Sequence, residues 1–219
     1  MGTEQRIIDM AIELFNDEGT GAVSTNHIAR ALGISPGNLY YHFRNKEEII
    51  RAIYAQVRPA WEEAAAVPAD RAPTVADAER ILASYFGLVW DYRFYYRELP
   101  ALLRRDPELA KEYRDVRRAG LANIEGLLAA FVAAGVMHAP PDRGALADLA
   151  QVCWVLVDFW LPFAELSDED QSQLLDRDAI IERGVAAVFG VLRPYFIDAA
   201  LASDGPRAMG GRTDLGANS

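Results

Sequence analysis

Two short helical segments joined by a tight turn near the N-terminus constrain the fold more than any other feature of this chain. Residues 24–32 have apolar side chains at helical spacing, with Ser24 or Thr25 as the N-cap. Gly33 ends this segment, and the next one, SPGNLYYH, begins at Ser35. With the helix before them, these segments make three helices in about 45 residues, the second and third joined by the tight Gly33-Ile34-Ser35 turn. The pattern predicts a helix-turn-helix.

The rest of the chain also carries helix signals. An amphipathic helix precedes the pair and ends near Gly19, and a fourth helix starts at Asn45, with Glu48 in a capping-box position. Further helices are expected from four start signals: Thr74, Asp106-Pro107, Pro140-Pro141-Asp142 (to about Trp160, before Pro162) and Asp178 (to Phe196). We therefore expect an all-α fold.

The predicted helices divide the chain into two domains. Residues 1–46 form a helix-turn-helix domain of three helices, and the helix from Asn45 connects it to a larger helical domain of residues 47–200. Residues 201–219 are rich in glycine without apolar periodicity, so we expect a disordered tail.

Charge and composition exclude several classes of protein. The N-terminus lacks a signal peptide and no run of eighteen apolar residues occurs, so we expect a soluble cytoplasmic protein without a membrane partner. Cys153 is the single cysteine, and the three histidines show no metal-ligand spacing, so no metal or cofactor is expected. The sequence shows no glycine-rich phosphate loop or nucleophile elbow, which argues against an enzyme.

The net charge of −10 argues at first against a nucleic-acid partner. However, residues 20–46 contain no Asp or Glu, while Arg30, Arg44 and Lys46 are basic. Screening limits exposed charges to about 8 Å at physiological salt, so acidic residues elsewhere need not cancel this basic segment.

The short helix after the turn has two different faces. At about 100° per residue, Leu39 and Phe43 share one face and are expected in the core, while Asn38 and Tyr41 lie on the other. A major groove about 12 Å wide admits such a helix, where Asn38 can reach a base edge. Tyr40, on a flank, can donate to phosphate. Simple packing of the tyrosines is the alternative.

Residues 25–46, TNHIARALGISPGNLYYHFRNK, closely resemble the DNA-binding signature of the tetracycline-repressor (TetR) family of bacterial transcriptional regulators. The resemblance covers the first four helices. It implies DNA-backbone contacts by Thr25, Tyr40, His42 and Lys46, and major-groove positions for Pro36, Gly37, Asn38 and Tyr41. The complete set of DNA-contact candidates is Thr25, Asn26, His27, Ser35, Pro36, Gly37, Asn38, Tyr40, Tyr41, His42 and Lys46. Proline and glycine offer no side-chain hydrogen bonds, so specificity for a DNA sequence can depend on DNA shape.

The same resemblance implies a ligand pocket in the C-terminal domain, where most aromatic residues lie. The candidates for its lining are Trp61, Tyr85, Phe86, Val89, Trp90, Phe131, Trp154 and Asp158. Asp158 stands in the apolar run VLVDFW, and a buried carboxylate needs a partner, either a protein donor or a polar group of the ligand. The charged segment 97–118 is expected to be a solvated helix face.

The resemblance further implies a homodimer made by the last two long helices, residues 142–160 and 178–196. Their composition agrees with burial on several faces, and Gly184, Ala186, Ala187 and Gly190 would allow a partner helix to approach. Packing within one chain explains these features almost as well.

These expectations combine into one function with one alternative. The chain is expected to be a ligand-responsive transcriptional repressor that binds a palindromic DNA operator as a dimer and is released by a largely apolar small molecule. The alternative keeps the helix-turn-helix but makes the C-terminal domain a structural or protein-binding dimeriser without a small ligand.

Overall fold

The computed structural model describes residues 2–68, 70–142, 144–166 and 176–203. These residues form helices and no β-strand; an isolated bridge pairs Met137 with Phe196. The predicted all-α fold is therefore confirmed. The helices are α1 Thr3–Glu18, α2 Thr25–Leu32, α3 Pro36–His42, α4 Lys46–Ala64, α5 Val75–Asp91, α6 Arg93–Arg105, α7 Pro107–Ala133, α8 Ala145–Glu165, α10 Arg177–Leu192, a 3-10 turn Arg193–Tyr195 and α11 Asp198–Ser203.

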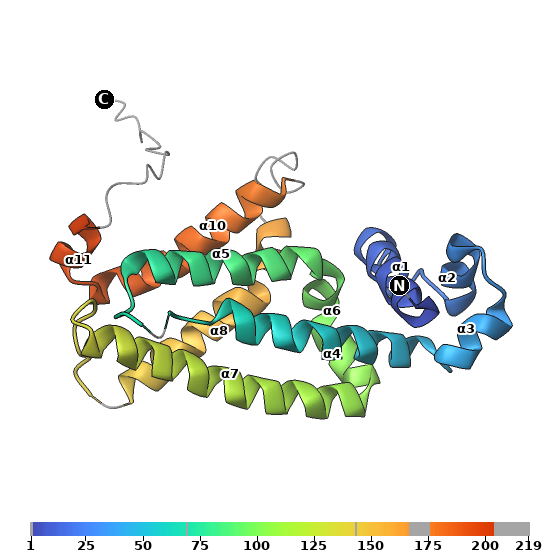
Figure 1. Cartoon of the computed structure of the whole chain (residues 1–219), viewed down its shortest axis with the longest axis horizontal. Coiled ribbons are helices and arrows are strands. Elements are labelled where there is room, and N and C mark those ends of the chain that lie inside the picture. Colours follow the sequence, from blue (N-terminus) through green and yellow to red (C-terminus); the bar gives the residue numbers. More distant parts are fainter. Residues whose placement is uncertain (1, 69, 143, 167–175, 204–219) are drawn as a thin grey trace.

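The molecule is elongated, with α1, α2 and α3 at one end (Figure 1). Helix α4 runs from that end into the larger helical body, where α5 and α7 lie along the long axis and α8 and α10 run obliquely to it (Figure 1). Helix α10 packs on α5 and α8, while α7 packs on α8. Helix α6 contacts both α1 and the body, so α4 and α6 join the two parts of the chain.

The helix starts follow the predicted caps. The Thr74 hydroxyl accepts from the backbone N–H of Asp77, and the Asp77 carboxylate accepts from the backbone N–H of Thr74. These two bonds make a capping box. The Asp106 carboxylate accepts from the N–H groups of Glu108 and Leu109 at 3.0 and 3.2 Å. Asn45 accepts from Glu48 N–H at 2.8 Å. Local sequence therefore determines where α4, α5 and α7 begin.

The sequence predicts that the helix starting near residue 142 ends before Pro162, and this prediction is wrong. Helix α8 passes through Pro162 to Glu165, because the neighbouring Leu161 and Ala164 are fully buried and their packing outweighs one lost backbone hydrogen bond. Helix α8 also starts later than predicted. The Asp142 carboxylate accepts from the N–H groups of Gly144 and Ala145, and the helix begins at Ala145.

The C-terminal end also differs from expectation. Helix α10 ends at Leu192 and gives way to the 3-10 turn Arg193–Tyr195 instead of continuing to Phe196. Helix α11 then extends to Ser203, into the segment expected to be disordered. The remainder of the predicted tail, 204–219, lies outside the described residues.

Gly184 of α10 packs against Phe86 on α5 of the same chain. A Cβ atom at this position would lie 2.6 Å from the Phe86 ring, which is fully buried on α5. The absence of a side chain at Gly184 therefore allows α10 to approach α5, so this glycine serves packing within one chain.

Helix α8 is, among the described residues, long and apolar enough to cross a membrane by length and composition, with 28% of its most apolar window buried. One face packs on α5, α6, α7 and α10. A second face exposes large apolar side chains at helical spacing: Val152, Val155, Phe159, Phe163 and Leu166.

Candidate DNA interface and ligand cavity

Helix α3 is anchored by one face and presents the other, as its sequence predicts. Leu39 and Phe43 are buried, whereas the Tyr41 side chain is 84% exposed. The Ser35 hydroxyl caps the helix by accepting from Asn38 N–H at 3.2 Å. Pro36 and Gly37 then form an exposed first turn without bulky side chains, so another backbone can approach it closely.

The turn between α2 and α3 depends on Gly33. This residue has φ +67°, a left-handed conformation that favours glycine. Its N–H and that of Ile34 donate to the carbonyls of Arg30 and Ala29, which closes the end of α2 and starts the path to α3. The turn therefore fixes how α3 stands on α2.

The N-terminus of α2 lies beside α3. Ser24, rather than Thr25, is the N-cap, accepting from His27 N–H at 3.2 Å. Thr25 is thereby free of the capping role, and its Oγ1 lies 3.1 Å from the Tyr40 hydroxyl. The structure thus brings together two of the residues expected on the DNA backbone, on two different helices. The other polar candidates on these helices, Asn26, His27, Asn38, Tyr41 and His42, are exposed or partly exposed.

Lys46 has a structural role that its sequence position does not reveal. Its Nζ donates to the carbonyl of Val23 at 3.0 Å and to that of Thr20. The ammonium therefore ties the start of α4 to the loop between α1 and α2. Because an ammonium has three N–H groups, these two bonds leave one for a further acceptor.

A cavity of about 1060 Å³ lies among α4, α5, α6, α7, α8 and α10. Five of the predicted lining residues reach its wall: Trp61, Tyr85, Phe131, Trp154 and Asp158. The prediction is wrong for Phe86, Val89 and Trp90, which do not line it. Phe86 and Val89 are fully buried in the packing of α5, and Trp90 lies beneath the Arg93 guanidinium, 5.2 Å from its ring centre. The period of α5 places these side chains inward, but it does not distinguish core from cavity.

Several cavity residues were not among the candidates. Many are aliphatic or small, and the aromatic ones include Tyr54, Tyr95, Tyr96 and Tyr113. Tyr113 stands in a charged segment expected to be a solvated face, and only the α7–α8 contact shows that it turns inward. Tyr54 was recognisable as an inward residue of α4 by its spacing from Ile50 and Val57.

Asp158 is 7% exposed and has a protein donor. The Tyr113 hydroxyl donates to its Oδ2 at 2.6 Å, and the Trp154 indole N–H lies 3.4 Å from the same hydroxyl. Burial raises the pKa of Asp158 to about 6, opposed by these donors and by Arg117. The carboxylate is therefore satisfied by protein and still lies at the cavity wall.

Gly120 determines where Trp154 lies. A Cβ atom at Gly120 would stand 2.2 Å from the Trp154 ring, closer than any real contact. The indole consequently occupies the space that a side chain on α7 would fill. This close approach sets the position of the Trp154–Tyr113–Asp158 group in the wall.

No group of three or more His, Cys, Asp or Glu side chains in the described residues is arranged to hold a metal ion. Cys153 lines the cavity, but burial raises the pKa of its thiol to about 11, which disfavours the reactive thiolate.

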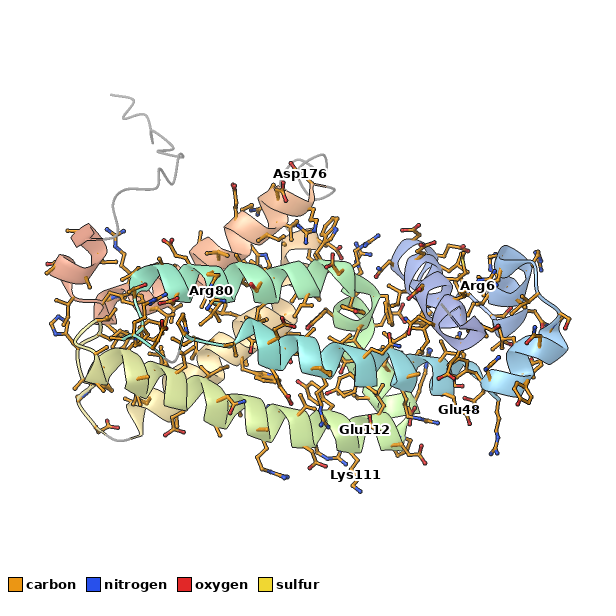
Figure 2. The ribbon with its side chains drawn as sticks, in the orientation of Figure 1. Arg6, Glu48, Arg80, Lys111, Glu112 and Asp176 are labelled. Atoms are coloured by element: carbon orange, nitrogen blue, oxygen red, sulfur yellow. The ribbon has the colours of Figure 1, made fainter. Side chains whose placement is uncertain are left out.

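Helix α4 connects the two candidate sites. Glu48 lies at its N-terminal end beside α3 (Figure 2), while Tyr54 and Trp61 reach the cavity further along. The Tyr54 ring packs on Trp61 and on Tyr95, with centroids 5.5 and 5.3 Å apart. Tyr95 of α6 therefore packs directly on a side chain of α4 that lines the cavity.

A polar network holds the N-terminal helices against α6. Asn16 donates to the carbonyl of Asp91 at 2.8 Å and accepts from Phe94 N–H at 3.0 Å. The Glu98 carboxylate accepts from the N–H of Thr20 at 2.7 Å and from its hydroxyl. The α1–α2 loop is thus bound both to α6, through Glu98, and to α4, through Lys46.

Two family matches cover nearly the whole chain. Residues 7–53 match the family described as "Bacterial regulatory proteins, tetR family", and residues 58–203 match "Bacterial transcriptional repressor", TetR. The first extends beyond the expected boundary at residue 46 into α4, the helix that both domains share.

Curated relatives are regulators of the same kind. The chain is 27% identical over 190 residues to the HTH-type transcriptional regulator UidR of Escherichia coli K12, covering 86% of this chain and 91% of UidR. It is 42% identical over 53 residues to SrpR of Pseudomonas putida, and this match spans only 25% of SrpR.

Solved structures of TetR-family regulators share the fold of this chain. A TetR-family transcriptional regulator from Marinobacter aquaeolei VT8 has TM-score 0.82 and 33% identity, covering 93% of this chain and 97% of that one. The SmeT–triclosan complex shares the fold, with TM-score 0.63, 19% identity and coverage of 91% and 94%. The matched domains and their coverage show that this chain belongs to the TetR family of bacterial transcriptional regulators, which bind DNA.

Proposed function

We propose that this protein is a ligand-responsive repressor that binds a palindromic operator as a homodimer and is released when a small molecule occupies the cavity. The observation that carries the proposal is the path of α4. This one helix begins at Lys46, shortly after α3 ends at His42, and supplies Tyr54 and Trp61 to the cavity wall. A change at one site therefore has a direct mechanical route to the other.

The DNA contacts follow from the two faces of α3. Its exposed first turn, Pro36-Gly37-Asn38, enters the major groove, where Asn38 and Tyr41 face base edges. Thr25, Tyr40 and His42 contact phosphates on the flanks, and Lys46 reaches another phosphate with its third N–H. Asn26, His27 and Ser35 complete the contact surface.

The dimer is proposed to form through α8 and α10. Support comes from the apolar side chains that α8 leaves exposed, including Phe163 at 67% and Leu166 at 85%. A contiguous exposed stripe of this kind favours a second copy of the chain over water. Two α3 helices in such a dimer would have to match half-sites about 34–36 Å apart or a multiple of that distance.

Ligand response is supported by the cavity itself. Its volume of about 1060 Å³ and its wall of aliphatic and aromatic side chains suit a sizeable, mostly apolar molecule. SmeT, which shares the fold, has been solved with triclosan. A ligand that tilts α4 would change the separation of the two α3 helices, and a coupling of about 1–3 kcal/mol would suffice to weaken operator binding. The regulator would act where the genome lies, in the cytoplasm.

The experiment has two stages. Fragments of genomic DNA selected by the purified full chain should yield a palindrome with half-sites in the predicted spacing, bound by two protomers. Compounds that raise the melting temperature in a thermal-shift panel should then release that operator in a fluorescence-anisotropy titration.

Two results would overturn the proposal. Selection without any sequence enrichment would contradict a specific operator. Compounds that stabilise the protein but leave operator affinity unchanged would contradict ligand release and favour the structural or protein-binding dimeriser.

A further inference from the structure

The charges on the cavity wall are unbalanced. Among the described residues that line it, four carry carboxylates, Glu62, Glu112, Asp115 and Asp158, and one carries a guanidinium, Arg58. No lysine or histidine in the described residues joins them. Two of these acids have arginine partners, Glu62 with Arg58 at 3.8 Å and Asp115 with Arg118 at 3.3 Å, so the charge that a bound molecule meets depends mainly on Asp158.

The single cation on the described wall lies at the exposed rim. Arg58 is exposed and its Nε lies 3.8 Å from Glu62 on the same helix, so its charge is shared with an acid and with water. Lys111, a neighbour of Glu112 on α7, extends away from α4 (Figure 2) and does not line the cavity. Neither cation neutralises the interior.

Asp158 is the buried acid of this set, whereas the other three are exposed. Its partners in the described structure are the Tyr113 hydroxyl and, through it, the Trp154 indole, and neither carries a positive charge. The charge of the exposed Arg117 on α7 also favours the ionised form of Asp158, but the two side chains form no ion pair in the described structure. A buried carboxylate without a charged partner is costly and gains most from a counter-ion brought by a ligand.

Several aromatic rings line the same cavity as this carboxylate. Tyr54, Trp61, Tyr95, Tyr96, Tyr113 and Trp154 all line the cavity, and the charge of Asp158 contributes to the raised pKa of the tyrosine hydroxyls on α4, α6 and α7. The faces of tyrosine and tryptophan rings attract cations, and the rings also hold apolar bodies. The wall therefore combines one buried anion with several surfaces that accept a cation.

We propose that the cavity is selective for lipophilic cations: a quaternary ammonium, phosphonium or hydrophobic amine whose charge lies near Asp158 and whose apolar body fills the aromatic wall. This inference rests on the proposed ligand-binding function and specifies its ligand class. An anionic amphiphile, such as an acyl chain with a phosphate or carboxylate head, is disfavoured by the same charges.

The test uses three probes of similar shape and different charge. Tetraphenylphosphonium is the cation, tetraphenylborate the matched anion and triphenylphosphine oxide a neutral compound. Binding to the DNA-free full chain is followed by tryptophan fluorescence, since Trp61 and Trp154 line the cavity, and by calorimetry. We expect the cation to bind at least tenfold more tightly than either of the others.

Two variants locate the charge. Asp158→Asn keeps an acceptor for Tyr113 and should lower affinity for the cation at least tenfold while leaving the neutral probe within about twofold. Asp148→Asn makes the same change on the exposed side of α8 and should alter neither affinity. Retained binding of the neutral probe shows that the Asp158 variant is folded.

Three outcomes would overturn the inference: equal affinity for all three probes, preference for the anion or the neutral compound, or unchanged cation affinity in Asp158→Asn. Because binding is measured without DNA, these outcomes are separate from failure of the proposed function, which would appear as absent operator binding or absent release.

Discussion

The Arg51 guanidinium on α4 lies 2.6 Å from the Asp106 carboxylate, which is also the N-cap of α7. Glu108 adds a second carboxylate at 3.3 Å. Asp106 is buried and Arg51 is mostly buried, so this pair is less screened than a surface ion pair. It joins the helix that leaves the DNA-binding domain to a helix that lines the cavity.

Replacing Arg51 by methionine should therefore loosen this connection while keeping the apolar stem. We expect the free energy of unfolding to fall by about 1–3 kcal/mol and the ligand-induced change in operator affinity to shrink by about 0.5–2 kcal/mol. Chemical denaturation and operator titration with and without ligand measure the two effects. Arg118→Met, which removes an exposed pair with Asp115, is the control and should change little. Equal effects of the two substitutions would contradict a coupling role.

Tyr40 and Asn38 should differ in what they contribute to DNA binding. Tyr40→Phe removes a hydroxyl proposed to contact phosphate, so operator and random DNA should both be bound more weakly by about 1 kcal/mol. Asn38→Ala should instead relax sequence preference, at about 1–3 kcal/mol for the affected base pair. Binding selections with each variant distinguish these roles, and the reverse pattern would reject them.

Lys46→Met should affect both folding and DNA binding. The substitution removes the donor to the carbonyls of Val23 and Thr20, which are then left without this partner, so we expect a loss of about 1–3 kcal/mol in stability. The proposed phosphate contact predicts in addition that the slope of log affinity against log salt becomes shallower by about one unit. A destabilised variant with an unchanged salt slope would show that Lys46 serves the loop alone.

Asp158 should make stability depend on pH. Burial raises its pKa from the ordinary value of 3.8 to about 6, so the folded state holds the proton more tightly than the unfolded state. The protonated acid is tolerated below about pH 4, and the cost of ionisation builds up as pH rises from about 4 to about 6. Tyr113 and Arg117 of α7 and Trp154 of α8 are the groups that oppose this shift.

Asp158→Asn should remove that dependence. Relative to the variant, the wild-type protein should lose about 3 kcal/mol of stability between pH 4 and pH 7. Urea denaturation at matched protein concentration across this range measures the difference, in which the contributions of all other groups cancel. A constant difference would mean that Asp158 titrates normally.

Gly120→Ala tests the position of Trp154. The added methyl group would overlap the indole, so the ring must move, at a cost of about 1–3 kcal/mol and with altered tryptophan fluorescence. Gly126→Ala on the same helix meets nothing within 4 Å and should be neutral or stabilising by up to about 1 kcal/mol, because alanine favours helix. Similar melting temperatures for the two variants would contradict the close approach of α7 to Trp154.

Helix starts were predictable because their signals are local. The caps at Asn45, Thr74 and Asp106 act through bonds to residues two or three positions away. Pro162 shows the limit of such reasoning, since the continuation of α8 depends on how Leu161 and Ala164 pack against other helices. The free-energy cost of a proline inside a helix can be predicted from the sequence, but the tertiary packing that outweighs this cost cannot.

The sequence by itself determined the helical fold, the turn at Gly33 and the anchored and exposed faces of α3, because each depends on short-range spacing and backbone conformation. Only the tertiary structure decided which aromatic residues line a cavity and which fill the core. Phe86 and Tyr85 are adjacent on α5, yet one packs on Gly184 and the other reaches the cavity. Tyr113 becomes the partner of Asp158 only when α7 and α8 meet, 45 residues apart in sequence. Periodicity shows that a side chain points inward, whereas contacts between distant helices determine what it meets there.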